Sequence, residues 1–321
     1  MSRANRAVRA AVLATVIASS GTVAVHVATT QEGLDGRQAA VARPHPLPDN
    51  GYRYERLGTP PRTVVRARGA IVATFTDGAR TAVITGPART FSEPTRTPAV
   101  VTTTAWVRLT PQPWSQHAET ADWFRPWLDA AVADRGDDVL AVATQYLDGA
   151  PAVTNDKSVR YRGDASFGRA DFHDYLGVNW SFAPGVTAKP APDRYGALDA
   201  AGFVRLVYGY RLGYPLRDEA GRGAGLPRTP AAMAAFDAGA PITTGRLELQ
   251  PGDLLFLDTR RGGKGEVDHV GIFLGLDQSG RPRFVSSRKR AGGPTFGDDG
   301  APLVLDQPRE KGLGLRSARR L

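Results

Sequence analysis

A buried helix is predicted to begin in the stretch Leu198-Asp199-Ala200-Ala201-Gly202-Phe203-Val204. Asp199 stands where an N-cap residue belongs, because its carboxylate can accept a hydrogen bond from a free backbone N–H of the first turn. Apolar side chains then recur at helical spacing on one face, at Phe203, Val204, Val207 and Tyr208. Gly213 and Pro215 supply the stop signal that ends this helix.

Three apolar strands are predicted downstream of this helix. The turn Pro251-Gly252-Asp253 leads into an apolar run at 254–257, and Val267-Asp268-His269 leads into a second run at 270–275. A third strand is expected at 283–289, and Gly271 would let its strand approach a neighbour closely. These strands predict a sheet on which the helix packs.

The helix and the strands together resemble the NlpC family of papain-like cell-wall cysteine peptidases. In that family the nucleophile helix begins Asp-Cys-Ser-Gly-Phe/Leu-Val, and the strands read Pro-Gly-Asp-Leu-x-Phe-Phe and His-Val-Gly-Ile-Tyr-x-Gly. The resemblance covers residues 137–321. It implies an α+β fold, in which a papain-like NlpC-type domain with a helix on an antiparallel sheet follows a small β-rich segment.

The resemblance also implies roles for individual residues. His269 takes the position of the family's base, and Ser286, with Ser287 as the alternative, takes the position of the group that orients it. Ala200 takes the nucleophile position, where it is not competent. Three further residues, Asp199, Tyr161 and Asp268, are implied as ligand-binding, and Tyr161 takes that place only after an insertion.

Thiol catalysis requires a thiolate at a helix N-terminus, stabilised by the helix dipole and a nearby imidazolium. The methyl group of Ala200 cannot ionise or attack, and Ala201 lacks the hydroxyl that is common at the next position. The whole sequence contains no cysteine, which excludes disulfides, cysteine-ligated zinc and a lipid-modified cysteine. A serine nucleophile at Ser286 would need its own oxyanion donors and would not stand at a helix N-terminus.

Three functions therefore remain open. The leading one is an exported, catalytically impaired pseudo-peptidase that binds peptidoglycan stem peptides or a cell-wall protein partner in the inherited cleft, since binding and bond-making use different groups. The second is an active peptidoglycan endopeptidase, a hydrolase with an unrecognised nucleophile. The third is a structural envelope protein. No cofactor is implied.

No metal site is expected either. Asp171, His173 and Asp174 cluster in a long segment at 155–197, but their spacing matches no recognised ligand pattern. We expect this segment to be a loop that shapes a cleft wall. A short Ala-rich helix at 230–238 is expected to border the same cleft.

The N-terminus has the layout of an export signal. Arginines in residues 1–10 precede a mildly apolar stretch at 11–28, which predicts a cleaved signal peptide or an uncleaved anchor over 1–28. Either one predicts an extracytoplasmic protein, secreted or associated with the cell envelope. Contact with a membrane is expected only through this segment, if it stays uncleaved.

Further boundaries follow from composition and patterning. The proline-containing stretch 29–62 is interpreted as a linker, 63–112 as a small β-rich segment and 113–321 as the NlpC-like domain. Asp77-Gly78 predicts a hairpin, and Gly86-Pro87 is expected to end its second strand. Residues 119–148 are predicted to be helical, divided at Gly136.

The net charge of +9 suits contact with an acidic polymer, or simply a solvated basic surface. Its positive charges include clusters at both ends of the chain, the C-terminal one being Arg316, Arg319 and Arg320. No run of Lys and Arg interleaved with aromatic residues is present, so no nucleic-acid module is predicted.

Overall fold

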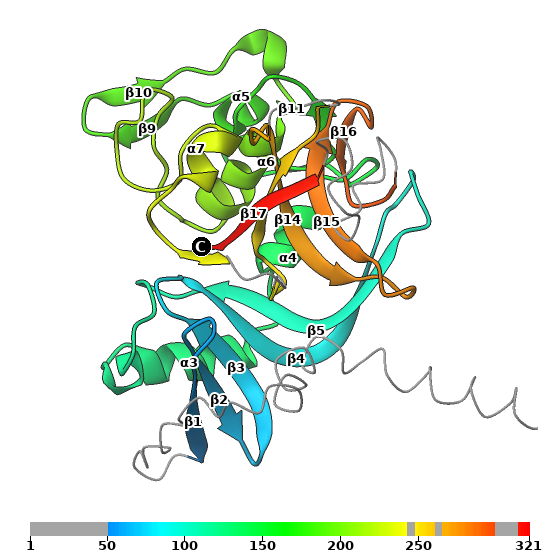
Figure 1. The fold of residues 1–321 in the computed structure, drawn as a ribbon. Helices are drawn as coiled ribbons and strands as arrows, with labels where there is room; N and C mark the ends of the chain where they lie inside the picture. The colour runs from blue at the N-terminus through cyan, green and yellow to red at the C-terminus, as the bar shows by residue number, and fades with distance from the viewer. Residues whose placement is uncertain (1–50, 243–247, 261–264, 299–313) are drawn as a thin grey trace, which may run out of the picture.

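The computed structural model describes residues 51–242, 248–260, 265–298 and 314–321, and its first part is a five-stranded antiparallel sheet (Figure 1). Its strands follow one another in sheet order as β1 (Tyr52–Leu57), β2 (Arg62–Ala67), β3 (Ala70–Thr76), β4 (Thr81–Ser92) and β5 (Val100–Leu109). The hairpin predicted at Asp77-Gly78 joins β3 to β4 and is confirmed.

Strand β4 continues through Gly86-Pro87, so the end predicted there is wrong. Its pairing with β5 is regular up to Thr85 and resumes at Arg89, with a shift of register between them. Proline has no N–H to donate to a ladder and is therefore found at such irregularities. Pro87 interrupts the pairing here without ending the strand.

Helix α3 (Phe124–Ala133) packs on this first sheet. Phe124 is fully buried, with its ring 5.4 Å from that of Phe75 and 5.0 Å from that of Trp114 between centroids. This aromatic core joins residues 54 to 131 and so extends across the boundary predicted between 112 and 113. The N-terminal unit extends to the end of α3.

Strand β1 lies inside the linker predicted over 29–62. Tyr54 of this strand is buried, and its ring lies 6.0 Å from that of Phe124. The aromatic side chain anchors the strand to the core, whereas the polar composition around it suggested a linker. Residues 1–50, which hold the predicted signal or anchor and most of the linker, lie outside the described residues.

The second unit is built on a six-stranded antiparallel sheet with the order β12-β17-β13-β14-β15-β16 (Figure 1). Its strands are β12 (Ala240–Ile242), β13 (Leu254–Asp258), β14 (His269–Leu276), β15 (Pro282–Arg288), β16 (Gly293–Thr295) and β17 (Gly314–Arg320). The three predicted strands are confirmed as β13, β14 and β15. At Gly271 a Cβ would lie 2.4 Å from the ring of Phe284, so this glycine does permit close packing.

The predicted buried helix is confirmed as α6 (Ala200–Arg205), which continues as a π-helical turn, η5 (Leu206–Arg211). Every residue of α6 is buried, and the helix packs on β14 and β15. The fold is thus α+β, with a helix on an antiparallel sheet preceded by a β-rich unit. The remaining elements are η3 (Ala118–Thr120), α4 (Val139–Thr144), β6 (Val153–Thr154), β7 (Arg160–Arg162), β8 (Ser166–Phe167), α5 (Phe172–Leu176), β9 (Trp180–Ala183), β10 (Val186–Ala188), η4 (Pro192–Arg194), β11 (Ala197–Leu198) and α7 (Pro230–Ala234).

Two of the three C-terminal arginines, Arg319 and Arg320, are buried, and Arg316 is half-buried. Arg320 is 2% exposed and donates two hydrogen bonds of 2.8 Å to the carboxylate of Asp253. Arg319 donates to backbone carbonyls, and Arg316 pairs with Asp258 at 3.0 Å. Strand β17 lies between β12 and β13, so its cations require buried partners.

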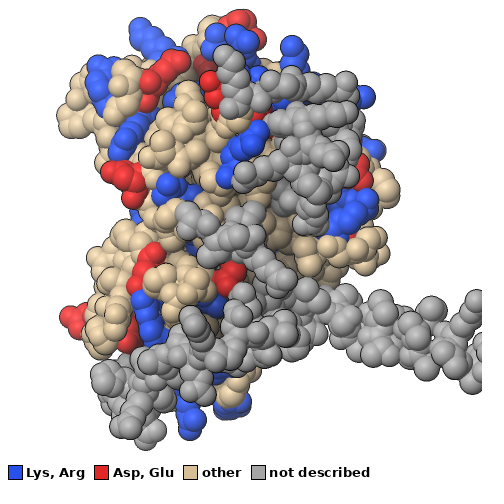
Figure 2. All heavy atoms as spheres, viewed as in Figure 1, with Lys and Arg blue, Asp and Glu red and all other residues tan. Residues whose placement is uncertain are grey.

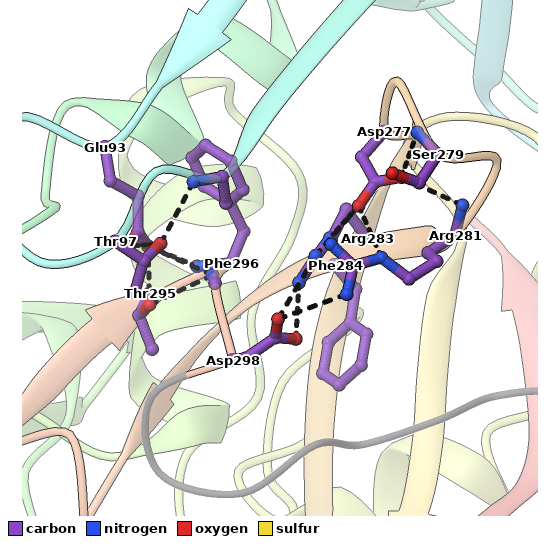
Figure 3. A network of polar contacts seen from close by, with 12 residues as sticks. Glu93, Thr97, Asp277, Ser279, Arg281, Arg283, Phe284, Thr295, Phe296 and Asp298 are labelled. Atoms are coloured by element: carbon purple, nitrogen blue, oxygen red, sulfur yellow. Dashed lines mark hydrogen bonds and ion pairs between the residues drawn. The ribbon is translucent and has the colours of Figure 1, made fainter.

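A buried carboxylate joins the two units (Figure 3). Glu93, which follows β4, accepts hydrogen bonds from the hydroxyl of Thr295 and from the backbone N–H of Phe296 at 2.7 Å. Its other oxygen accepts from Thr97 at 2.6 Å. Because a buried carboxylate is costly unless its oxygens are satisfied, these contacts hold the end of β4 against β16.

In the described part of the chain, no helix combines the length and the apolar character needed to cross a bilayer.

Candidate functional site

A cavity with a volume of about 1600 Å³ opens at the start of α6. Asp199 and Ala200 line it from the helix, and Asp268 and His269 line it from the start of β14. A wall formed by segments of 167–194 and a loop at 218–230 complete it. The positions that the sequence predicts for a nucleophile and a base therefore share one cavity.

Local packing fixes the start of α6. Asp199 is the N-cap, and its carboxylate accepts a hydrogen bond of 2.7 Å from the N–H of Gly202, as predicted. At Gly202 a Cβ would lie 2.3 Å from the carbonyl oxygen of Ala170, so only glycine fits between the helix and that segment. Ala200 is 5% exposed and presents its methyl group where the family resemblance expects a thiol.

Buried ion pairs hold the cavity wall against this helix. Arg228 donates two hydrogen bonds to the carboxylate of Asp199 and lies 3.6 Å from that of Asp171. The fully buried Arg205 donates to both oxygens of Asp171, at 3.0 and 3.1 Å. Burial alone would lower the pKa of Arg228, but the two carboxylates outweigh it and raise that pKa above its ordinary value.

The strand side of the cavity carries a histidine contact. The Nε2 atom of His269 lies 3.0 Å from the Oγ atom of Ser286, and the tautomer of the imidazole decides which of the two donates. Ser286 also accepts a hydrogen bond of 3.1 Å from the Nε of Arg288. Ser287 instead donates to the carbonyl of Leu198, so Ser286 is the serine that faces the histidine.

His269 is neutral at neutral pH. Burial lowers the pKa of this imidazole, the positive charge of Arg288 lowers it further, and the resulting pKa is about 3. A thiol peptidase needs an imidazolium beside its thiolate. The surroundings of His269, its burial and the charge of Arg288, disfavour that imidazolium.

No hydroxyl group on the described cavity lining makes a described hydrogen bond to His269. Among the described residues that line the cavity there is no serine, and the three threonines are Thr187, Thr229 and Thr259. Thr229 caps helix α7, and Thr259 is held by the carboxylate of Asp268 at 3.1 Å. Neither contacts His269 through a described hydrogen bond, which a base-activated nucleophile would require.

Two of the predicted site residues lie outside the cavity lining. Ser286 contacts His269, as predicted, but it is fully buried and does not line the cavity. Tyr161 does not line the cavity either, and its ligand-binding role stays a prediction. It lies on β7, paired with β6, where the guanidinium of Arg211 stacks 5.0 Å from its ring centre. That packing occupies the face of the ring.

The segment expected to form a cleft wall does so. Asp171, His173 and Asp174 line the cavity, and the two aspartates form a capping box at the ends of the first turn of α5. Their carboxylates are thus used by the backbone and by Arg205. Within the described ranges, no group of three His, Cys, Asp or Glu residues is arranged to hold a metal ion.

Two functional residues escaped the sequence analysis. Arg228 reaches Asp199 across 29 positions, and no local pattern marks that contact. Arg288 ends the observed strand β15 and lies within the predicted strand 283–289, whose alternation could have placed it on the same face as Ser286.

Comparisons with known proteins give structural likeness only. No protein-family model matches the sequence, and no curated protein matches it. The structure is similar to NlpC2 from Trichomonas vaginalis, with a TM-score of 0.32 and 14% identity over 85% of this chain and 81% of that one. It is also similar to an NlpC/P60 family protein from Bacillus cereus, with a TM-score of 0.26 and 13% identity over 84% and 79%. Inferences about this chain rest on its own residues.

Proposed function

We propose that the protein is an exported, NlpC-like cell-wall protein that binds peptidoglycan peptides in its cavity without cleaving them. The observation that carries this proposal is the pairing of Ala200 and His269 in one cavity of about 1600 Å³. A cavity with His269 at the base position and the methyl group of Ala200 at the nucleophile position can still hold a ligand, but it lacks the group that would attack that ligand.

The scaffold around the cavity supports binding. The N-cap Asp199, the close approach at Gly202 and the ion pair of Arg228 keep the start of α6 fixed. A preformed cavity avoids part of the ordering cost that binding otherwise meets. Pockets for drug-sized ligands typically have volumes of about 300–1000 Å³. The cavity of about 1600 Å³ is larger and therefore suits a peptide of several residues.

An active endopeptidase is the alternative that the cavity supports less well. It would need an activated nucleophile near His269, and Ser286, the nearest hydroxyl, is fully buried and lies outside the cavity lining. A neutral imidazole can still act as a base, but it has no substrate-facing hydroxyl as a described partner.

Export and the identity of the partner belong to the same proposal. The arginine-rich and then apolar residues 1–28 support delivery to the cell envelope, where peptidoglycan peptides or a cell-wall protein partner are present. The alternative of a structural envelope protein predicts that the cavity binds nothing.

Co-sedimentation of the protein with insoluble peptidoglycan tests the proposal, with soluble peptide release measured in the same samples. We expect retention without release. Ala220→Trp, which adds bulk to an exposed position on the cavity lining, should reduce retention, whereas Ala70→Trp on the exposed start of β3 should not. Equal retention of both variants, or none of the unmodified protein, would contradict a binding role for the cavity.

A further inference from the structure

The acidic residues of the cavity are already engaged within the protein, with one exception. Asp171 pairs with Arg205, Asp199 with Arg228, and Asp218 with Arg222. The carboxylate of Asp174 accepts from backbone N–H groups, and that of Asp268 accepts from Thr259. Glu219 is exposed and makes no ion pair among the described residues.

The basic residues of the cavity fall into two groups, those with a partner in the protein and those without a carboxylate nearby. Arg222 and Arg228 are paired, and Arg288 donates to Ser286 and to backbone carbonyls. Five exposed cations have no carboxylate within ion-pair distance among the described residues, and these are Arg169, Lys189, Arg194, Lys289 and Arg290. Among the described residues, the cavity therefore presents five cations without an ion-pair partner against one carboxylate without one.

On the face shown in Figure 2, basic and acidic side chains are interspersed. Charges of opposite sign at close spacing cancel within about one Debye length, roughly 10 Å at 0.1 M salt. Uncompensated cations around a concave site keep their field and attract anionic groups.

We infer that the cavity selects a zwitterionic peptide of net negative charge, with carboxylates placed on the five free cations. This inference rests on the proposed function and adds the property by which the site chooses its ligand. A uniform polyanion such as polyphosphate fits less well, because it offers no cationic group to Glu219 on the same lining. A peptide that carries both carboxylates and an amine meets both kinds of charge, with Glu219 open to the amine.

The test uses the soluble peptide fraction of digested peptidoglycan and the same fraction after amidation of its carboxylates. Titration calorimetry with the full chain should show binding of the first and at least about tenfold weaker binding of the second, since only the ligand's charge differs. The affinity for the first should also fall as salt rises, because the contacts are exposed.

Two charge-matched triple variants assign the selection to the cavity. Arg169→Gln/Lys289→Gln/Arg290→Gln should weaken binding about tenfold. Arg53→Gln/Arg68→Gln/Lys157→Gln removes the same number of exposed charges outside the cavity lining and should leave the affinity unchanged. Both change the net charge from +9 to +6, which follows from removing three cations.

The outcomes separate the two proposals. Equal binding of native and amidated fractions, or equal losses in the two triple variants, would overturn charge selection and leave peptide binding intact. Stronger binding of sodium tripolyphosphate than of the native fraction would overturn it in favour of a general polyanion site. Binding of neither fraction would overturn the proposed function as well.

Discussion

The helix side and the strand side of the cavity differ in which features of the expected site they contain. On the helix side, the cap of Asp199, the close packing at Gly202 and the ion pair of Arg228 are all in place, yet the reactive position is Ala200. On the strand side, His269 keeps its contact with Ser286, but its surroundings hold it neutral. The difference indicates that the packing of α6 can be kept without a reactive side chain at position 200, because the groups that position α6 also stabilise the fold.

The largest effect expected from this comparison is on the helix side. Gly202→Ala should lower the free energy of unfolding by about 3 kcal/mol, because a Cβ would lie 2.3 Å from the carbonyl oxygen of Ala170 and the backbone must shift. Urea unfolding followed by circular dichroism measures this. Gly58→Ala is the control, because nothing lies within 4 Å of its Cβ. Equal stabilities of the two variants would refute the close packing at Gly202.

The next effect concerns the cap. Asp199→Ala should cost about 2 kcal/mol, since it removes the N-cap and one partner of Arg228. The two side chains are 23% and 16% exposed, so the cost stays below that of a fully buried pair. Asp156→Ala, at an exposed position, is the matched control in the same urea experiment. A cost no larger than that of the control would show that the ion pair and cap contribute nothing.

On the strand side we expect a dependence on pH. The pKa of His269 is about 3 in the folded protein and 6.5 ordinarily, so between these values the unfolded chain binds the additional proton. Its contribution to stability is complete above pH 6.5 and falls by about 1.4 kcal/mol for each pH unit below it. Urea midpoints at pH 6.5 and 5.5 should therefore differ more in the unmodified protein than in His269→Gln. Parallel pH profiles would contradict a buried neutral histidine.

The smallest effect is expected from restoring sulfur. Ala200→Cys should change stability by less than about 0.5 kcal/mol, because the side chain grows by one atom beside a cavity. The new thiol should be alkylated by iodoacetamide slowly at pH 7, since a neutral His269 provides no imidazolium to stabilise a thiolate. The absence of any other cysteine makes the labelling unambiguous. Rapid alkylation below pH 7 would contradict this, because it would show that the site stabilises a thiolate.

Local signals explain what could be predicted from the sequence. The N-cap and apolar spacing marked α6, and the Pro-Gly-Asp turn and apolar runs marked β13, β14 and β15. The family resemblance supplied the pairing of His269 with Ser286, which the structure shows at 3.0 Å.

Contacts between distant residues explain the rest. The buried Arg320 pairs with Asp253, which lies 67 positions away in the sequence. No local pattern indicates that this arginine is buried. Tyr54 and α3 were placed outside the β-rich segment because their aromatic core forms only when β1 and α3 meet on the sheet. The strand pairing that holds Tyr161 could not be predicted, because a short motif match carried no information on it.

The most direct test of the account is prolonged incubation of the unmodified protein and His269→Ala with purified peptidoglycan, with bound protein and released soluble peptides both quantified. The account predicts that the unmodified protein is retained by the peptidoglycan and that neither protein releases peptide above a protein-free control. Release by the unmodified protein that His269→Ala abolishes would contradict it, and would show that an unrecognised nucleophile acts with this histidine.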